Sequence, residues 1–205
     1  MNEKMLVAIK NLRESSKKRK FAQTFDAIVS LKELDLKKPE SKINEDVALP
    51  HGKGKESNVL IFSDSVKTDK AQVYSGGHLE LLTRNKRAAK NAAKSTDFIL
   101  ADAKLMSTVG RILGQYLGPK GKIPKVLTGD VNALIENLKK SVKVRVKDSP
   151  VIQCPLGNEN MTDQQVAENL QALLNFLEKR LPKGKSNIGK VEVKLTMSKP
   201  TRVEL

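Results

Sequence analysis

The stretch Gly110–Gly129, GRILGQYLGPKGKIPKVLTG, contains the change from helix to loop around which this chain is organised. Apolar residues recur at helical spacing up to Leu117, which predicts an amphipathic helix. Gly118-Pro119 predicts its end, because glycine tolerates a left-handed cap and proline cannot continue the hydrogen-bond ladder. The loop that follows carries three lysines, Lys120, Lys122 and Lys125. We interpret it as a cationic binding loop at the end of a helix.

This loop matches neither of the common phosphate-binding motifs. A nucleotide-binding P-loop ends in Gly-Lys-Ser/Thr at a helix start, whereas Gly121-Lys122 is followed by Ile123-Pro124. A dinucleotide fingerprint needs its glycines spaced differently from those of Gly110–Gly114, and it needs them after a strand. On local grounds alone, a solvated basic loop without a ligand is an equally good interpretation.

The composition points to a polyanionic partner. The 205 residues carry 38 lysines and arginines against 23 acidic residues, a formal charge of +15, and such an excess favours nucleic acid. Aromatic residues are only 3% of the chain and tryptophan is absent, which argues against a protein that stacks successive unpaired bases. Recognition of structured nucleic acid through its backbone and shape fits the composition better.

Cysteine usage and hydropathy bound the remaining classes. The single Cys154 excludes an internal disulfide and a cysteine-rich zinc site. Met1–Lys10 is amphipathic and lacks the apolar core of a signal peptide, and no apolar run approaches membrane-spanning length. We therefore expect a soluble, cytoplasmic protein with no membrane partner, no metal and no cofactor.

The two ends of the chain share one style. Residues 2–16 predict an amphipathic helix, and residues 24–32 alternate as a half-buried strand, with Ile28 out of place on the polar side. A short strand ending at Leu49-Pro50 follows. Near the C-terminus, Thr162 and Gln165 form a capping box that starts a helix, and residues 188–197 alternate as a long strand. Alternation of this kind indicates an antiparallel sheet with one face covered.

The middle of the chain has a different pattern. The runs 59–62 and 98–101 are continuously apolar, as in parallel strands that are covered on both faces. Between and after them we predict further elements: a short helix at 66–72, a strand at 73–74, helices at 79–94 and 131–141, the helix ending at Leu117, and an edge strand at 142–147. Strands that alternate with helices predict an α/β domain with a largely parallel sheet.

The two styles predict two domains. Residues 1–57 and 153–205 are each near the size at which a core is marginal, but together they make one ordinary domain. The predicted fold is therefore a split outer α+β domain, an antiparallel sheet with helices on one face, and an inserted Rossmann-like α/β domain at 58–152. Two adjacent chain crossings make hinge motion the default expectation. The inserted segment has 17 basic and 8 acidic residues, so charge alone would place the nucleic acid there.

Several motifs in a fixed order resemble the ribosomal protein L1 family of the large subunit. Besides GRILGQYLGPKGKIPK they are Lys20–Thr24 (KFAQT), Leu49–Lys55 (LPHGKGK) and Lys194–Met197 (KLTM). Gly157-Asn158-Glu159, followed by Met161-Thr162-Asp163, is more similar to the archaeal and eukaryotic branch than to the bacterial one. The resemblance covers essentially the whole chain.

The resemblance implies a fold and a role. Members of this family have a split outer domain with an inserted α/β domain, and they bind a folded rRNA segment that forms a mobile stalk. The stalk lies by the exit site and moves as deacylated tRNA leaves. Many members also bind a similar structure in their own mRNA and repress its translation. The implied partners are the rRNA stalk, exit-site tRNA and the protein's own mRNA, and we expect a monomer off the ribosome.

The resemblance also implies a site, carried over by motif to the outer domain. It comprises Lys20, Phe21, Thr24, Thr196, Met197 and Ser198. A ring and a thioether can pack on ribose and base edges, while hydroxyls reach 2′-OH groups and phosphates. Phe21 and Met197 could instead belong to the core. Serine at 198 replaces the family's usual glycine, which would add strain if positive φ were required there. A secondary RNA contact would use Lys53, Lys55, Lys120, Lys122 and Lys125.

Two other functions compete with this one. A phosphate-cofactor-binding α/β enzyme would need a nucleotide loop or a convergent acid–base set, and the only histidines are His51 and His78, on different segments. The expected answer is that the protein is not an enzyme. A free RNA-binding repressor without a place on the ribosome cannot be distinguished by sequence; cofractionation with large subunits would decide between the two.

Overall fold

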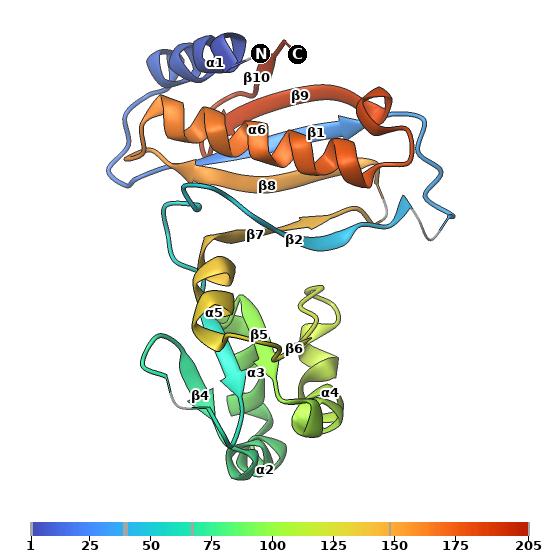
Figure 1. Cartoon of the computed structure of the whole chain (residues 1–205). Helices are drawn as coiled ribbons and strands as arrows, with labels where there is room; N and C mark the ends of the chain where they lie inside the picture. The colour runs from blue at the N-terminus through green and yellow to red at the C-terminus, as the bar shows by residue number, and fades with distance from the viewer. Residues whose placement is uncertain (1, 39–40, 67, 148, 205) are drawn as a thin grey trace. The chain divides into compact units, whose positions relative to one another are not determined.

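The computed structural model describes residues 2–38, 41–66, 68–147 and 149–204 (Figure 1). The chain divides into two compact units. Unit 1 comprises 1–56 with 140–205, and unit 2 comprises 57–139. Within the described ranges, no helix combines the length and apolar character that crossing a bilayer would need.

Unit 1 is built on a four-stranded antiparallel sheet in the order β10-β9-β1-β8. Its strands are β1 (Thr24–Leu31), β8 (Val151–Asn158), β9 (Ile188–Leu195) and β10 (Thr201–Val203). Helices α1 (Asn2–Ser15) and α6 (Asp163–Arg180) pack on it, and Figure 1 shows α6 lying along the sheet. A 3-10 turn, η2 (Gly184–Asn187), connects α6 to β9.

One apolar core holds unit 1 together. Along β1, buried residues alternate with half-buried ones, and the buried set is Phe25, Ala27, Val29 and Leu31. Both helices contribute to the same core as these residues, so α1 and α6 cover the same face of the sheet. This is the single-face coverage that the alternating pattern predicted. The predicted capping box of Thr162 and Gln165 is present at the start of α6.

The strand expected at the edge of the inserted domain belongs to unit 1 instead. β7 (Ser141–Arg145) pairs antiparallel with β2 (Asn44–Ala48) in a separate two-stranded sheet. Val142, Val144 and Val146 are buried in the core of unit 1. The second chain crossing therefore lies at Lys139–Lys140 and not at Ile152–Gln153. The alternation Val-Lys-Val-Arg-Val was interpreted correctly as a strand, but alternation does not identify the partner strand.

Unit 2 is a parallel sheet in the order β4-β3-β5-β6. The strands are β3 (Val59–Phe62), β4 (Gln72–Tyr74), β5 (Phe98–Ala101) and β6 (Lys125–Val126). Helices α2 (Gly76–Arg84), α3 (Lys86–Ser95) and α4 (Ala103–Leu117) contribute to one apolar cluster with β3 and β5. Helix α5 (Val131–Lys140) contributes to a second cluster formed by the alternate residues of the same strands. Both faces of β3 and β5 are thus covered, as their continuous apolar runs predicted.

Three local predictions in unit 2 are corrected by the structure. The helix expected at 79–94 is two helices, because Asn85 leaves helical geometry and caps α3 through Ala88 N. The described residues between 66 and 71 form no helix and Gln72 begins β4, while Lys67 lies outside the described residues. The left-handed glycine after α4 is Gly121, at φ +66°, and Gly118 keeps right-handed helical angles.

Candidate nucleic-acid interface

Three chain segments meet at one end of the unit 1 sheet. β1 begins there, β8 ends there and β9 ends there, as the pairs Thr24–Asn158 and Phe25–Leu195 show. The six predicted contact residues lie on two of these segments. We call this set the sheet-end surface: Lys20, Phe21, Thr24, Thr196, Met197 and Ser198.

The two apolar members of the sheet-end surface are exposed. Phe21 is 52% exposed and Met197 is 60% exposed. The alternative that both belong to the core is therefore wrong. Strand β9 ends at Leu195, so Met197 lies in the turn beyond it and not on the buried side of a longer strand. An exposed ring and an exposed thioether in the same unit can pack against ribose and base edges.

The threonines of the sheet-end surface bond to each other's segment. The Thr196 hydroxyl accepts a hydrogen bond from Thr24 N at 3.0 Å, and it lies 3.4 Å from Thr24 O. This hydroxyl thus joins the ends of β1 and β9. Its first role is positional, whereas the sequence suggested a hydroxyl that simply faces the RNA.

A buried glutamine, which the sequence did not single out, holds the surface from below. Gln23 is 1% exposed. Its side-chain oxygen accepts from Met197 N at 3.2 Å, and its backbone N–H donates to the Glu159 carboxylate at 3.0 Å. Glu159 N donates in turn to Gln23 O at 2.8 Å. Gln23 therefore fixes both the Met197 turn and the loop after β8.

Arg13, at the end of α1, completes this frame. Its guanidinium donates to Glu159 O at 2.7 Å, to Met161 O at 2.9 Å and to the Asp163 carboxylate at 2.9 Å. It also lies over the Phe25 ring, 5.2 Å from the centroid. A fork of donors that reaches three acceptors holds the loop after β8 rigidly. No local pattern predicted this, because the partners lie about 150 residues away along the chain.

Ser198 fits its position without strain. Among the described residues, Glu33 is the only one other than glycine with positive φ. The Ser198 hydroxyl accepts from Leu195 N at 2.8 Å and lies 3.0 Å from Lys199 O, to which it can donate. The serine side chain thus closes the turn after β9, and the strain expected for a serine in place of glycine is not present.

The Leu49–Lys55 loop is docked at the same end of unit 1. Asn169 of α6 is fully buried. Its amide donates to Gly52 O at 2.8 Å and to Leu156 O at 2.7 Å, and its oxygen accepts from His51 N at 3.1 Å. The His51 ring also bonds the Glu168 carboxylate, which holds the pKa of Glu168 below its ordinary value.

Close packing at Gly54 brings this loop to the sheet end. Gly54 has φ +75°, and an added Cβ would lie only 2.6 Å from the Asn158 Cβ. Only glycine satisfies both conditions. Since Asn158 pairs with Thr24, the loop that carries Lys53 and Lys55 is held beside the segment that starts the sheet-end surface. Lys53 is half-buried and Lys55 is exposed.

The three lysines of the opening stretch belong to unit 2, and two of them contact a helix end. Lys122 Nζ donates to Ala93 O at 3.2 Å and also to Thr96 O, and Lys120 Nζ lies 3.4 Å from Ala93 O. These carbonyls lie at the C-terminus of α3, where cations complement the helix dipole. Lys125 is exposed in β6. The loop is thus partly a capping structure, which the sequence did not reveal.

Comparison with known proteins identifies the family. The model of the Ribosomal protein L1p/L10e family matches residues 12–199. The chain belongs to the ribosomal protein L1 family.

Relatives in this L1 family match over nearly their full length. Large ribosomal subunit protein uL1 of Pyrococcus horikoshii is 39% identical, with 98% of this chain and 96% of that protein covered. The uL1 protein of Methanocaldococcus jannaschii is 40% identical, covering 98% and 95%. That of Methanobrevibacter smithii is 39% identical, covering 99% and 100%. These relatives are archaeal, in agreement with the branch that the Gly157–Asp163 segment indicated.

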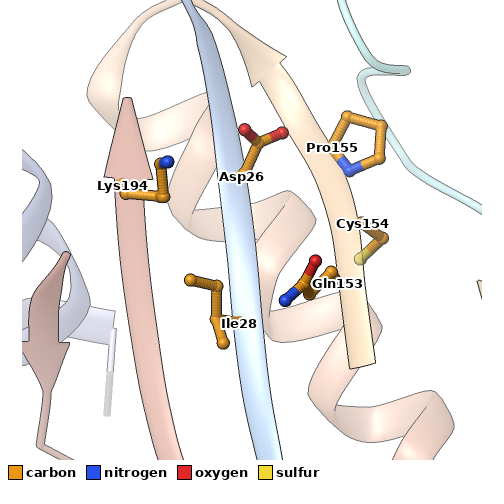
Figure 2. A pocket seen from close by; sticks show the side chains of 6 residues that line it. All are labelled: Asp26, Ile28, Gln153, Cys154, Pro155 and Lys194. Carbon is orange, nitrogen blue, oxygen red and sulfur yellow. The ribbon is translucent and has the colours of Figure 1, made fainter. Parts of the chain in front are cut away.

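The open face of the unit 1 sheet carries a pocket of about 290 Å³ (Figure 2). Asp26 and Ile28 line it from β1, which explains the apolar residue on the polar side of that strand. Lys194 lines it from β9, opposite Asp26. Desolvation raises the pKa of Asp26, and Lys194 partly opposes this. Gln153, Cys154 and Pro155 line it from β8.

Burial also determines the chemistry of the single cysteine. It raises the pKa of the Cys154 thiol to about 12, and the neighbouring Asp26 carboxylate adds to the effect. A thiol with that pKa is protonated at neutral pH, and the thiolate is the nucleophilic form. Cys154 is therefore a core side chain in this L1 family member and not a reactive thiol.

Proposed function

We propose that this chain is a structural constituent of the large ribosomal subunit that binds the rRNA stalk near the tRNA exit site. Membership in the L1 family supports this, and the relatives carry the name of a large-subunit protein. The binding surface is the sheet-end surface of unit 1. The protein is cytoplasmic, associated with ribosomes, and monomeric when free.

One observation carries the proposal: two exposed apolar side chains are held on a rigid, hydrogen-bonded frame. Phe21 and Met197 are more than half exposed. The segments beside them are fixed by Gln23, Glu159 and Arg13. Exposed large apolar side chains supported in this way indicate a binding surface. A preordered surface loses little side-chain freedom on binding a folded RNA.

The lysines supply a second, weaker contact. Lys53 and Lys55 extend the sheet-end surface along the docked loop. Lys120, Lys122 and Lys125 provide positive charge on unit 2. Since Lys120 and Lys122 direct their ammonium groups to the carbonyls of α3, they act through long-range attraction more than through specific contacts. This geometry also disfavours a nucleotide cradle in that loop, and hence the phosphate-cofactor enzyme.

Two further activities follow from binding a mobile rRNA stalk. Movement of the stalk with this protein assists release of deacylated tRNA from the exit site. A similar RNA structure in the protein's own mRNA would compete for the same surface, so the protein represses its own translation when rRNA is scarce. Both activities depend on the sheet-end surface.

The test compares exposed apolar truncations by fluorescence anisotropy with the stalk segment of Pyrococcus horikoshii rRNA. Phe21→Ala and Met197→Ala should each weaken binding by about fivefold to a hundredfold, as for loss of a stacked contact. Val7→Ala, which truncates a 57% exposed residue of α1 in the same unit, should change binding less than about twofold. Equal affinities for all four proteins would show that the sheet-end surface is not the RNA site.

Cofractionation separates a ribosomal constituent from a free repressor. The tagged chain, expressed in an archaeal host, should sediment with large subunits through a sucrose gradient. Phe21→Ala/Met197→Ala should move a larger share of it to the top of the gradient. Recovery of the parent chain only in free fractions would exclude a place on the ribosome.

A further inference from the structure

A groove on unit 2 lies between the α2–α3 pair and α4, apart from every residue predicted for RNA contact. Its volume is about 290 Å³. Two cations, Lys86 from α3 and Arg111 from α4, line it together with Gln115 and the Tyr116 ring. Within the part of the chain that the structure describes, no carboxylate lines this groove. Its floor is apolar and includes Ile112 and Ala89.

The start of α3 breaks a local rule of helix stability. Lys86 and Arg87 occupy the first turn, and no acidic residue is present there. The helix dipole disfavours cations at this end by several tenths of a kcal/mol each. Residues that break a local rule without a structural gain are expected at functional sites. The unfavourable position of Lys86 would be compensated by an anion bound in the groove.

We propose that this groove binds a nucleotide of a looped RNA strand, with backbone phosphates on Lys86 and Arg111 and the base or ribose against Tyr116. The volume is at the lower end of the range for ligand pockets, which suits one nucleotide better than a large cofactor. An aromatic face beside two cations is the combination that binds single-stranded nucleic acid. The amide of Gln115 can bond to a base edge. This inference extends the RNA-binding role proposed above to a second, separate site.

The primary test uses oligouridylate as the probe and the full-length protein. Lys86→Gln/Arg111→Gln should weaken oligouridylate binding by about tenfold and lower its salt slope by about 2, one per lost phosphate contact. The matched control, Lys94→Gln/Lys104→Gln, removes two charges from the same helices outside the groove and should change the affinity less than about threefold. Tyr116→Leu should weaken binding about fivefold through lost stacking. Equal losses in both charge variants would reduce the groove to a general field and overturn the proposal.

The two RNA sites can be tested independently. Phe21→Ala should weaken binding of the stalk rRNA and leave oligouridylate binding unchanged, whereas the groove variant should affect oligouridylate. If the parent does not bind the stalk rRNA but the groove variant loses oligouridylate, the proposed function fails and the groove stands. If Phe21→Ala loses oligouridylate and the groove variant does not, the groove proposal fails.

A crosslinking measurement covers the case in which a groove variant does not fold. Cys154 is buried, so a cysteine introduced on the surface can be labelled selectively with a photocrosslinker. Gln115→Cys should crosslink to oligouridylate at low probe concentration. Thr128→Cys, at an exposed loop position of the same unit, should not. Comparable crosslinking at both positions would contradict a site in the groove.

Discussion

At the scale of single residues, the buried polar side chains determine the geometry of the candidate interface. Gln23 and Asn169 are both at most 1% exposed, and each bonds backbone groups of segments far from it in sequence. A buried polar group left without a partner costs about 1–3 kcal/mol, so these contacts favour one arrangement over alternatives. The exposed residues that would touch RNA are positioned by buried residues that would not.

Asp26 should make the stability of unit 1 depend on pH. Burial raises its pKa above the ordinary value of 3.8, so the folded state holds the proton more tightly than the unfolded state. The stabilising contribution is complete below the ordinary pKa and is lost as pH rises through the folded-state pKa. At neutral pH, the half-buried carboxylate therefore destabilises the fold.

Asp26→Asn should then raise the melting temperature at about pH 7 by about 1–3 °C. The gain should shrink towards about pH 3, where the carboxyl is protonated in both states. Calorimetric melts of both proteins across this range measure the effect. A gain that is the same at every pH, or a loss at neutral pH, would mean that the pairing of Asp26 with Lys194 outweighs its desolvation.

At the scale of elements, the Leu49–Lys55 loop depends on one side chain of α6. Asn169→Ala leaves Gly52 O, Leu156 O and His51 N without their partner, which should cost about 2–4 kcal/mol in urea unfolding. The freed loop should also be cut faster by trypsin at Lys53 and Lys55. The matched control is Asn175→Ala, an exposed asparagine on the same helix, which should cost less than about 0.5 kcal/mol. Similar losses in both variants would show that the loop is held by other contacts.

The elements show which features a sequence can predict. Alternation, apolar runs and the Thr162–Gln165 capping box depend on neighbours a few residues apart, and these predictions are confirmed. The break at Asn85 was missed, because an asparagine inside a helical pattern looks like an ordinary surface residue until its cap is seen. The contacts of Arg13 and the pairing of β7 with β2 connect distant segments. Periodicity contains no information about such partners.

The same distinction applies to the candidate interface. The KFAQT and KLTM motifs located the sheet-end surface, including the exposed Phe21 and Met197. The frame beneath it was not predicted, since Gln23 and Glu159 carry no local signal of burial or contact. The lysines of the opening stretch were interpreted as free cations, yet Lys122 contacts α3. Side-chain direction in a loop depends on which helix end lies beside it.

At the scale of the whole molecule, the two chain crossings determine how unit 2 can be removed. Ser57 N donates to Lys139 O at 3.3 Å, so the two ends of unit 2 lie side by side. Leu49 N donates to Lys140 O at 3.2 Å on the unit 1 side. A short link can therefore join Glu56 to Lys140 without stretching either segment. Strand β7 follows the crossing and stays with the core of unit 1.

Two deletions that differ only in β7 test this boundary and the location of the RNA site together. Replacing Ser57–Lys139 with a short Gly/Ser link should leave unit 1 folded, with a cooperative melt, and with most of its affinity for the stalk rRNA. Replacing Asn58–Ile152 also removes Val142, Val144 and Val146 from the core. Each buried valine contributes about 1.5–3 kcal/mol, so this loss approaches the whole stability of an ordinary domain. The longer deletion should therefore be unfolded by circular dichroism and should not bind. If the shorter deletion folds but has lost the stalk rRNA, the RNA site belongs to unit 2, where most of the excess positive charge was first counted.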